Sequence, residues 1–259
     1  RNYYKVHLME KRKEIIAFDV DGVIFDSTEE CLVIAWNAHQ ELIGKDEKIS
    51  HPSEAKEDYD LKFRSIRNYV RSMDEYLVIF YGNISENPDQ KDFEECLSSI
   101  DDDLKKLYTK SFYNQRKEYK SRSYEQWIKL HYPYENILEI LKLCSKRKRL
   151  FMVTGKDKAS VKDLLDYFAS DVVVQEIYDK HAVENKLIAL KKIARDYNVQ
   201  HSEMKFIDDN VTHLFEPQKN EFNIALAEWG YAMPDHIMEA RKRNIPILSL
   251  NELKNFIGL

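Results

Sequence analysis

The chain has 259 residues, of which 43% are hydrophobic and 33% charged, with only 6 glycines and 6 prolines. This composition excludes disordered, collagen-like and linker-rich chains, and the length suffices for one large or two smaller domains with a sizeable core. The formal net charge of −5 gives no electrostatic reason to expect nucleic acid or an anionic membrane as a partner.

The sequence shows no recognisable membrane or secretory segment, and its cysteine usage indicates the compartment. No stretch approaches the roughly 18 consecutive apolar residues of a transmembrane helix, and residues 1–14 lack the apolar region of a secretory signal. Cys31, Cys96 and Cys144 lie far apart and without CxxC spacing, so we expect neither a disulfide scaffold nor a zinc site. A reducing, cytoplasmic compartment fits this usage best.

Short apolar runs predict the strands of a parallel sheet. The predicted strands are, in chain order, residues 15–18, 150–153, 172–174, 205–207, 225–227 and 245–248. The first, second and fourth are continuous apolar runs, which are typical of strands covered on both faces. The predicted helices around them are residues 159–168, 186–197, 236–243 and 250–257. This alternation predicts right-handed βαβ units and a doubly wound, Rossmann-like α/β core.

The block between the first two core strands has a different character. It shows no convincing strand and much helical periodicity, clearest in residues 62–80, 92–108 and 134–144, with a loop at 83–91. We therefore expect an all-helical domain inserted into the α/β core. The predicted division is 1–27 and 146–259 for the core, and 28–145 for the inserted domain.

Polar residues follow three of the predicted strands at their carboxyl ends. Asp19, Thr154 and Asp208 occupy these places, and ligands of open α/β sheets bind at this edge. Asp21 adds a second carboxylate just after the first strand, where burial is costly unless a cation or hydrogen bonds hold it. Gly22 permits a sharp turn there.

These segments resemble the four motifs of the haloacid dehalogenase (HAD) superfamily. They read Phe18-Asp-Val-Asp-Gly22, Val153-Thr-Gly-Lys156, a lysine before the last catalytic strand, and Phe206-Ile-Asp-Asp-Asn210. Their order and spacing match the family, and the helical insertion is similar to its C1-type cap. The stretch around residues 225–231 and 247–253 loosely resembles phosphoglycolate phosphatase relatives. The resemblance covers most of the chain, the inserted domain by position rather than by motif.

The resemblance implies a Mg²⁺-dependent phosphatase that works through an aspartyl-phosphate. Asp19 would be the nucleophile, and Asp21 the general acid and then the base. The Thr154 hydroxyl, the Gly155 N–H and one lysine would hold the phosphoryl oxygens. The metal site would comprise Asp19, the Asp21 carbonyl, Asp208 and, directly or through water, Asp209.

The lysine of the third motif has two candidates. Lys186 opens a predicted helix 22 residues before Asp208, close to the family's usual gap, and Lys180 is the alternative. The sequence departs from the common Lys-Pro form, since Leu187 follows Lys186. Lys156 and Lys158 are interpreted as surface residues.

In the inserted domain, Arg64, Arg67 and Arg71 fall on one face of a predicted helix. Either this face is solvated, or one or more of these arginines read an anionic or polyol substrate.

Asp21 favours phosphate-ester chemistry, because the leaving alkoxide needs a proton. The expected substrate is a small phosphorylated metabolite, such as a phospho-hydroxy acid or a sugar phosphate. A phosphomutase of the same fold and a non-catalytic interaction module are the alternatives, and the oligomeric state stays open.

Overall fold

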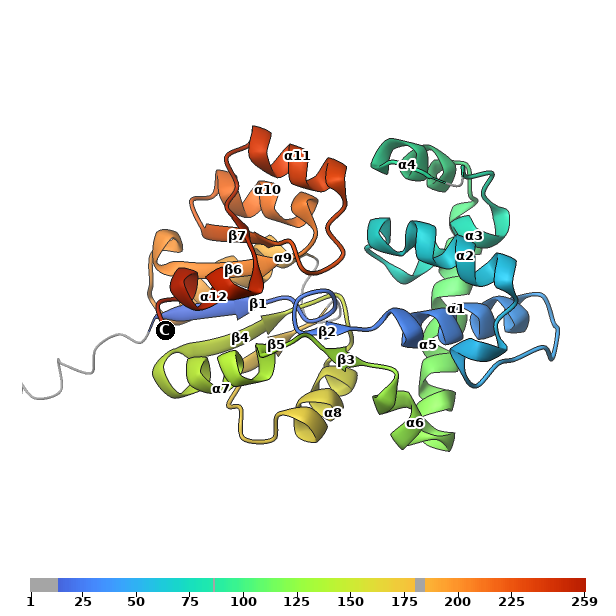
Figure 1. Cartoon of the computed structure of the whole chain (residues 1–259), viewed down its shortest axis with the longest axis horizontal. Coiled ribbons are helices and arrows are strands. Elements are labelled where there is room, and N and C mark those ends of the chain that lie inside the picture. The colour runs from blue at the N-terminus through green and yellow to red at the C-terminus, as the bar shows by residue number, and fades with distance from the viewer. Residues whose placement is uncertain (1–13, 86, 180–184) are drawn as a thin grey trace, which may run out of the picture. The chain divides into compact units, whose positions relative to one another are not determined.

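The structure, a computed structural model, describes residues 14–85, 87–179 and 185–259 (Figure 1). Its described residues form two compact units, the first from 14–24, 133–230 and 239–259, and the second from 25–132 and 231–238. These units differ from the expected division at three places: residues 133–145 belong to the first unit, and residues 25–27 and 231–238 belong to the second. The helix that begins within residues 133–145 buries Ile137, Ile140 and Leu141 and packs on a strand of the core sheet.

The first unit is built on a six-stranded sheet whose neighbouring strands are all parallel, in the order β5-β4-β1-β6-β7-β8, with helices around it (Figure 1). The strands are β1 (Ile15–Phe18), β4 (Arg149–Val153), β5 (Glu176–Tyr178), β6 (Met204–Asp208), β7 (Asn223–Ala227) and β8 (Ile247–Leu248). This confirms the doubly wound α/β core. The strand order reverses at β1, which lies between β4 and β6, so this is the point where such sheets bind ligands.

The helices of the core alternate with these strands. They are α7 (Ile137–Arg147), α8 (Lys158–Phe168), α9 (Lys186–Asp196), the short η5 (His201–Glu203), α10 (Val211–Lys219), α11 (Pro234–Lys242), which begins in the second unit, and α12 (Leu250–Ile257). Each of α8, α9 and α10 starts at an Asp or Asn whose side chain accepts a backbone N–H, the usual cap of a helix that follows a strand.

The predicted strand at 172–174 is wrong. Val172 donates a turn hydrogen bond to the Ala169 carbonyl, and Val173 is 60% exposed, so this β-branched run packs against little. The strand lies four residues later, where β5 pairs with residues 151–153 of β4. β-branched residues favour strands only when a sheet surface accepts them.

The second unit is helical except for one short pairing. Its helical segments are α1 (Thr28–Leu42), η2 (Pro52–Glu54), α2 (Glu57–Ile66), η3 (Arg67–Tyr69), η4 (Met73–Leu77), α3 (Val78–Tyr81), α4 (Gln90–Ser98), α5 (Asp102–Arg122) and α6 (Tyr124–Lys129). α1 and α5 pack side by side, and the Tyr108 hydroxyl donates to the Ala35 carbonyl. β2 (Phe25–Asp26) and β3 (Tyr132–Pro133), which sequence patterns did not predict, pair where the chain passes between the units.

Two predicted helices of this unit are interrupted. The helix expected over 62–80 breaks after η3, because the Glu75 carboxylate accepts the Arg71 backbone N–H and Ser72 donates to Asp74. Such local bonds between side chains and backbone compete with a continuous helix. The helix expected over 92–108 breaks before α5, whose cap is Asp101.

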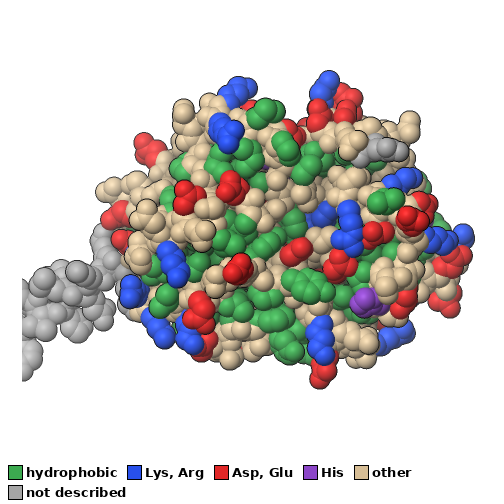
Figure 2. Space-filling view, in the orientation of Figure 1, with side chains coloured by type: hydrophobic (Ala, Val, Ile, Leu, Met, Phe, Trp, Pro, Cys, Tyr) green, Lys and Arg blue, Asp and Glu red, His purple; other side chains and the backbone are tan. Residues whose placement is uncertain are grey.

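Among the described residues, no helix has the length and apolar character that crossing a membrane requires. On the face that Figure 2 shows, Lys and Arg side chains are interspersed with Asp and Glu.

Candidate active site

Three polar side chains meet at the carboxyl edge of the sheet, within the first unit. Asp19 follows β1, Asp208 ends β6 and Thr154 follows β4, and all three are buried. The Asp19 N–H donates to the Ile207 carbonyl at 2.9 Å, and the Thr154 N–H donates to the Tyr178 carbonyl at 2.9 Å. The parallel pairing therefore brings together residues that lie far apart in the sequence.

Lys186, the first residue of α9, joins the two acids. Its Nζ lies 2.6 Å from Asp19 Oδ2 and 2.6 Å from Asp208 Oδ2. The Asn185 side chain accepts the Ile188 N–H and so caps the helix start that aims the lysine at this edge. The alternative, Lys180, lies outside the described residues.

Burial and charge act against each other at these three groups. Burial raises the pKa of Asp19, and the nearby Asp208 adds to this although Lys186 opposes it. Burial also acts to raise the pKa of Asp208, but Lys186 and His213 outweigh it and hold that pKa well below its usual range. The two carboxylates raise the pKa of Lys186 in spite of its burial. The site therefore keeps its lysine cationic and Asp208 ionised.

Three groups lie close enough together to hold a metal ion. Asp19, Asp208 and His213 each offer one ligand atom, and these atoms all lie within 4.8 Å of one another. Carboxylate oxygens suit hard divalent cations, and an imidazole nitrogen suits borderline ones. The residues present therefore fit a divalent metal ion.

No sequence pattern indicated His213 as a site residue. It lies in α10, with its Nδ1 3.3 Å from Asp208 Oδ1. The Asn210 N–H donates to the same oxygen at 2.8 Å, and the Asn210 side chain then caps α10, so the fold turns this histidine back toward the strand end. A lone histidine has no ligand spacing, and its one usable signal was its place in the helix that follows Asp208.

Two glycines let the neighbouring turns approach closely. Gly22 follows Asp21 and has a φ of 82°, which few other residues adopt. A Cβ at Gly230 would lie 2.0 Å from the Gly22 carbonyl oxygen and 2.6 Å from the Cβ of Asp209. Asp209, a predicted metal ligand, is itself buried at 4% exposure.

Lys156 is not the surface residue that we expected. Its side chain is 0% exposed, and its Nζ lies 3.1 Å from Oδ1 and 3.3 Å from Oδ2 of Asp21. The Lys156 N–H donates to Thr154 Oγ1 at 3.2 Å, and Gly155 lies half-buried between them. The expectation failed because sequence alone does not show that the turn after β4 faces the turn after β1.

The three arginines of the inserted domain do not share one helix. Arg64 lies in α2, Arg67 in η3, and Arg71 beyond both, because the helix ends at Ile66. Arg64 is exposed and bonds Asp60 and Glu29, whereas Arg67 is buried with its guanidinium carbon 3.8 Å from the centre of the Tyr231 ring. The predicted common face is therefore wrong.

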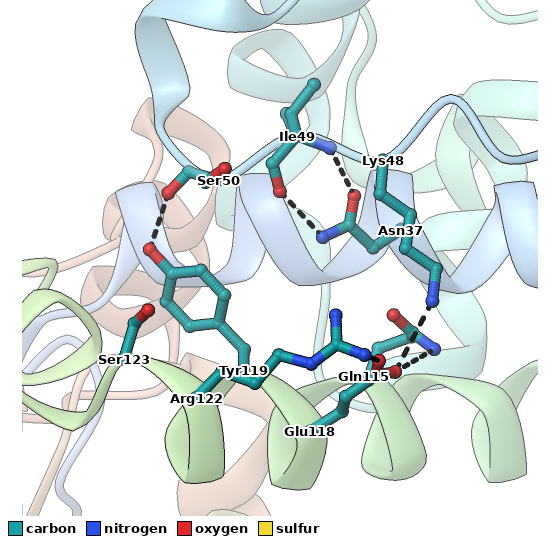
Figure 3. Close-up of a pocket in the computed structure, with 9 residues that line it drawn as sticks. All are labelled: Asn37, Lys48, Ile49, Ser50, Gln115, Glu118, Tyr119, Arg122 and Ser123. Atoms are coloured by element: carbon teal, nitrogen blue, oxygen red, sulfur yellow. Dashed lines mark hydrogen bonds and ion pairs between the residues drawn. The ribbon is translucent and has the colours of Figure 1, made fainter.

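A cavity of about 140 Å³ opens in the second unit, and none of the residues discussed above lines it (Figure 3). Its polar groups largely bond one another: Lys48, Gln115 and Arg122 all contact the Glu118 carboxylate, and the Tyr119 hydroxyl donates to the Ser50 carbonyl. We place no site there.

Comparisons with known proteins point to one family. Residues 13–214 match the family model of haloacid dehalogenase-like hydrolases. A crystal structure described as a predicted phosphatase from Clostridium acetobutylicum superposes with a TM-score of 0.64 at 16% identity, covering 95% of this chain and 99% of that one. One described as a predicted phosphoglycolate phosphatase from Haemophilus somnus gives 0.60 at 15% identity, covering 95% and 98%. No curated protein matches the sequence.

Proposed function

The chain belongs to the haloacid dehalogenase-like hydrolase family, and on this premise we propose that it is a phosphatase that hydrolyses a phosphomonoester of a small metabolite. One observation carries the proposal. Lys186 contacts both Asp19 and Asp208 at the carboxyl edge of the sheet, where the strand order reverses. Such a site offers a buried carboxylate beside a cation, which suits attack on an anionic phosphate.

In the proposed reaction, an Asp19 oxygen attacks phosphorus while the bond to the leaving oxygen breaks. Asp21 donates its proton to that oxygen, which leaves as the alcohol. Water then attacks the phosphorus of the aspartyl-phosphate and gives a proton to Asp21, and the bond to Asp19 breaks to release phosphate. The Asp19 N–H bond to Ile207 holds the nucleophile at the strand end during both steps.

Three groups would bind the transferred phosphoryl oxygens: the Thr154 hydroxyl, the Gly155 N–H and the Lys186 ammonium. Thr154 and Gly155 directly follow the carboxyl end of β4, and Lys186 is the first residue of α9. Prearranged donors of this kind stabilise charge that moves in the transition state.

For the metal we propose Mg²⁺, held by Asp19 and Asp208 with the Asp21 carbonyl, and by Asp209 directly or through water. Charge neutralisation between the carboxylate and the phosphate is the chemistry that this ion supplies when bound. His213 is a further candidate ligand, because it belongs to the same cluster.

For the substrate we propose a phospho-hydroxy acid such as phosphoglycolate, or a sugar phosphate, turned over in the cytoplasm. Support comes from a structural neighbour that is described as a predicted phosphoglycolate phosphatase. Neither nucleic acid nor a membrane is proposed as a partner, in keeping with the net charge of −5.

A turnover screen of phosphorylated metabolites tests this function. Wild type with Mg²⁺ should release phosphate from at least one small phosphomonoester, and exhaustive chelation should abolish the release. Dependence on an added sugar bisphosphate would indicate a mutase instead. Turnover that persists after chelation would overturn the proposed metal dependence.

A further inference from the structure

Lys156 is a buried cation that has no role in the proposed reaction steps. Its side chain is 0% exposed, although it lies in a turn, where a lysine can ordinarily extend into water. Taking an ammonium out of water is expensive unless a well-placed opposite charge compensates it. Asp21 supplies such a carboxylate.

We propose that Lys156 is a positioning residue, which holds the Asp21 carboxylate in the orientation that proton transfer requires. The inference rests on the proposed function, in which Asp21 serves the leaving oxygen and then water. In this role, Lys156 neither transfers a proton nor contacts the substrate.

The geometry of the pair supports a positioning role. Nζ contacts both Asp21 oxygens, at 3.1 and 3.3 Å, and so restrains a terminal carboxylate rotation that is otherwise broad. Asp21 has a side-chain exposure of 20%, so it stays accessible while the lysine is covered. The lysine therefore approaches from the protein side of the carboxylate.

Both turns that carry the pair are themselves held. The Ile24 N–H donates to the Val20 carbonyl at 2.8 Å and closes the turn that carries Asp21. On the other side, the Lys156 N–H bond to Thr154 ties the lysine to a proposed phosphate-binding hydroxyl. Loss of 1 Å of precision at a catalytic group can cost about 100-fold in rate, so this restraint matters to the reaction.

A comparison of leaving groups tests the proposal. The variants are Lys156→Met, Lys156→Arg and the matched control Lys158→Met, whose lysine is 41% exposed and pairs with Glu176 at the surface. The measured quantity is kcat/KM with Mg²⁺, for para-nitrophenyl phosphate and for an alkyl phosphate that the wild type accepts. This ratio reports the steps up to departure of the leaving group, so hydrolysis of the aspartyl-phosphate does not mask the effect.

We expect Lys156→Met to lower kcat/KM for the alkyl phosphate about 10–100-fold more than for the aryl phosphate, because an aryl oxide leaves without a proton. Lys156→Arg should recover part of this loss, and Lys158→Met should behave as wild type. In the Asp21→Asn background, adding Lys156→Met should cost nothing further, because the residue that it positions is already inactive.

Other outcomes contradict the inference. Equal losses on both substrates, or full additivity with Asp21→Asn, would show that Lys156 acts without Asp21. A loss confined to KM for carboxylated phosphates would make it a substrate contact instead. Thermal unfolding accompanies each assay, and Lys156→Gln replaces the methionine variant if that one unfolds. A wild type that turns over no phosphomonoester would overturn the proposed function and this inference with it.

Discussion

The Nζ of Lys186 lies 2.6 Å from a carboxylate oxygen of Asp208, whose side chain is 0% exposed. Asp19 contacts the same ammonium, so replacing Lys186 would leave two buried carboxylates without their lysine partner. Breaking a buried pair from one side costs about 3–5 kcal/mol. We predict that Lys186→Met lowers the free energy of unfolding of the metal-free protein by about this much, measured by urea denaturation at mildly alkaline pH.

The pH dependence of that loss has a defined sign. Without Lys186 the pKa of the carboxylates rises, so one of them takes up a proton as the pH falls, and the stability gap to wild type should narrow. Lys192→Met, which removes a surface partner of Asp196 from the same helix, should cost within about 1 kcal/mol. Equal stability of Lys186→Met and Lys192→Met would refute the electrostatic account of the site.

His213 should influence which metal binds best. Imidazole nitrogen favours borderline ions such as Mn²⁺ and Co²⁺, whereas Mg²⁺ prefers oxygen. We predict that His213→Ala weakens Mn²⁺ binding about tenfold or more while changing Mg²⁺ binding less. Calorimetric metal titration measures both affinities without relying on turnover. His201→Ala is the control, because His201 bonds the Asn220 carbonyl instead. Unchanged affinities for both ions would remove His213 from the metal site.

The arginines of the inserted unit should differ in their effects on stability. Arg67 is buried against Tyr231, so Arg67→Ala should lower the free energy of unfolding by about 1–3 kcal/mol. Arg64 is exposed, and Arg64→Ala should cost within about 1 kcal/mol. Denaturant unfolding of both variants checks this order, and a larger loss for Arg64→Ala would contradict it.

We also propose that one of these arginines contacts the substrate. At least one alanine variant among Arg64, Arg67 and Arg71 should raise KM for the natural substrate about tenfold, because it loses a charged hydrogen bond to that substrate. The KM for a minimal aryl phosphate should stay nearly unchanged. The check is KM for both substrates. Wild-type KM values in all three variants would show that these arginines do not contact the substrate.

The stability of the protein should also fall at acidic pH because of His236. Burial lowers the pKa of its imidazole, Arg71 acts in the same direction, and Asp235 opposes them. An unfolded histidine titrates near pH ~6.5. Below that pH the unfolded state binds a proton that the folded state resists, so stability is lost as the pH falls. Thermal unfolding across this range should show a shallower acid-side decline for His236→Gln, and parallel curves would contradict the assignment.

Much of the site was predictable because strand ends are easy to recognise. Asp19, Thr154 and Asp208 each follow a buried apolar run, and parallel strands place such residues at one edge. The resemblance to the family's third motif indicates Lys186, because this lysine opens a predicted helix 22 residues before Asp208. Both signals are local in sequence, so the sequence carries them.

Apart from His213, which lies only five residues after Asp208, and the local break near Arg71, the features that the sequence did not predict depend on contacts between distant segments. The buried Lys156 contacts Asp21, which lies 135 residues earlier in the sequence. Helical periodicity continues past Ile66, but the chain leaves the helical conformation after η3, where the Glu75 carboxylate accepts the backbone N–H of Arg71. The strand after α8 shifted from 172–174 to β5 because pairing with β4, rather than β-branching, decides which residues form it.

In the proposed reaction, Asp19 carries the transferred phosphoryl group. The direct measurement is peptide mass spectrometry on Asp21→Asn, mixed with substrate and Mg²⁺ and quenched in acid, because that variant should hydrolyse its intermediate slowly. We predict one added phosphoryl group on the peptide that contains Asp19, lost in the Asp19→Asn, Asp21→Asn double variant. A phosphoryl group on another residue, or wild-type turnover by Asp19→Asn, would show that Asp19 is not the nucleophile.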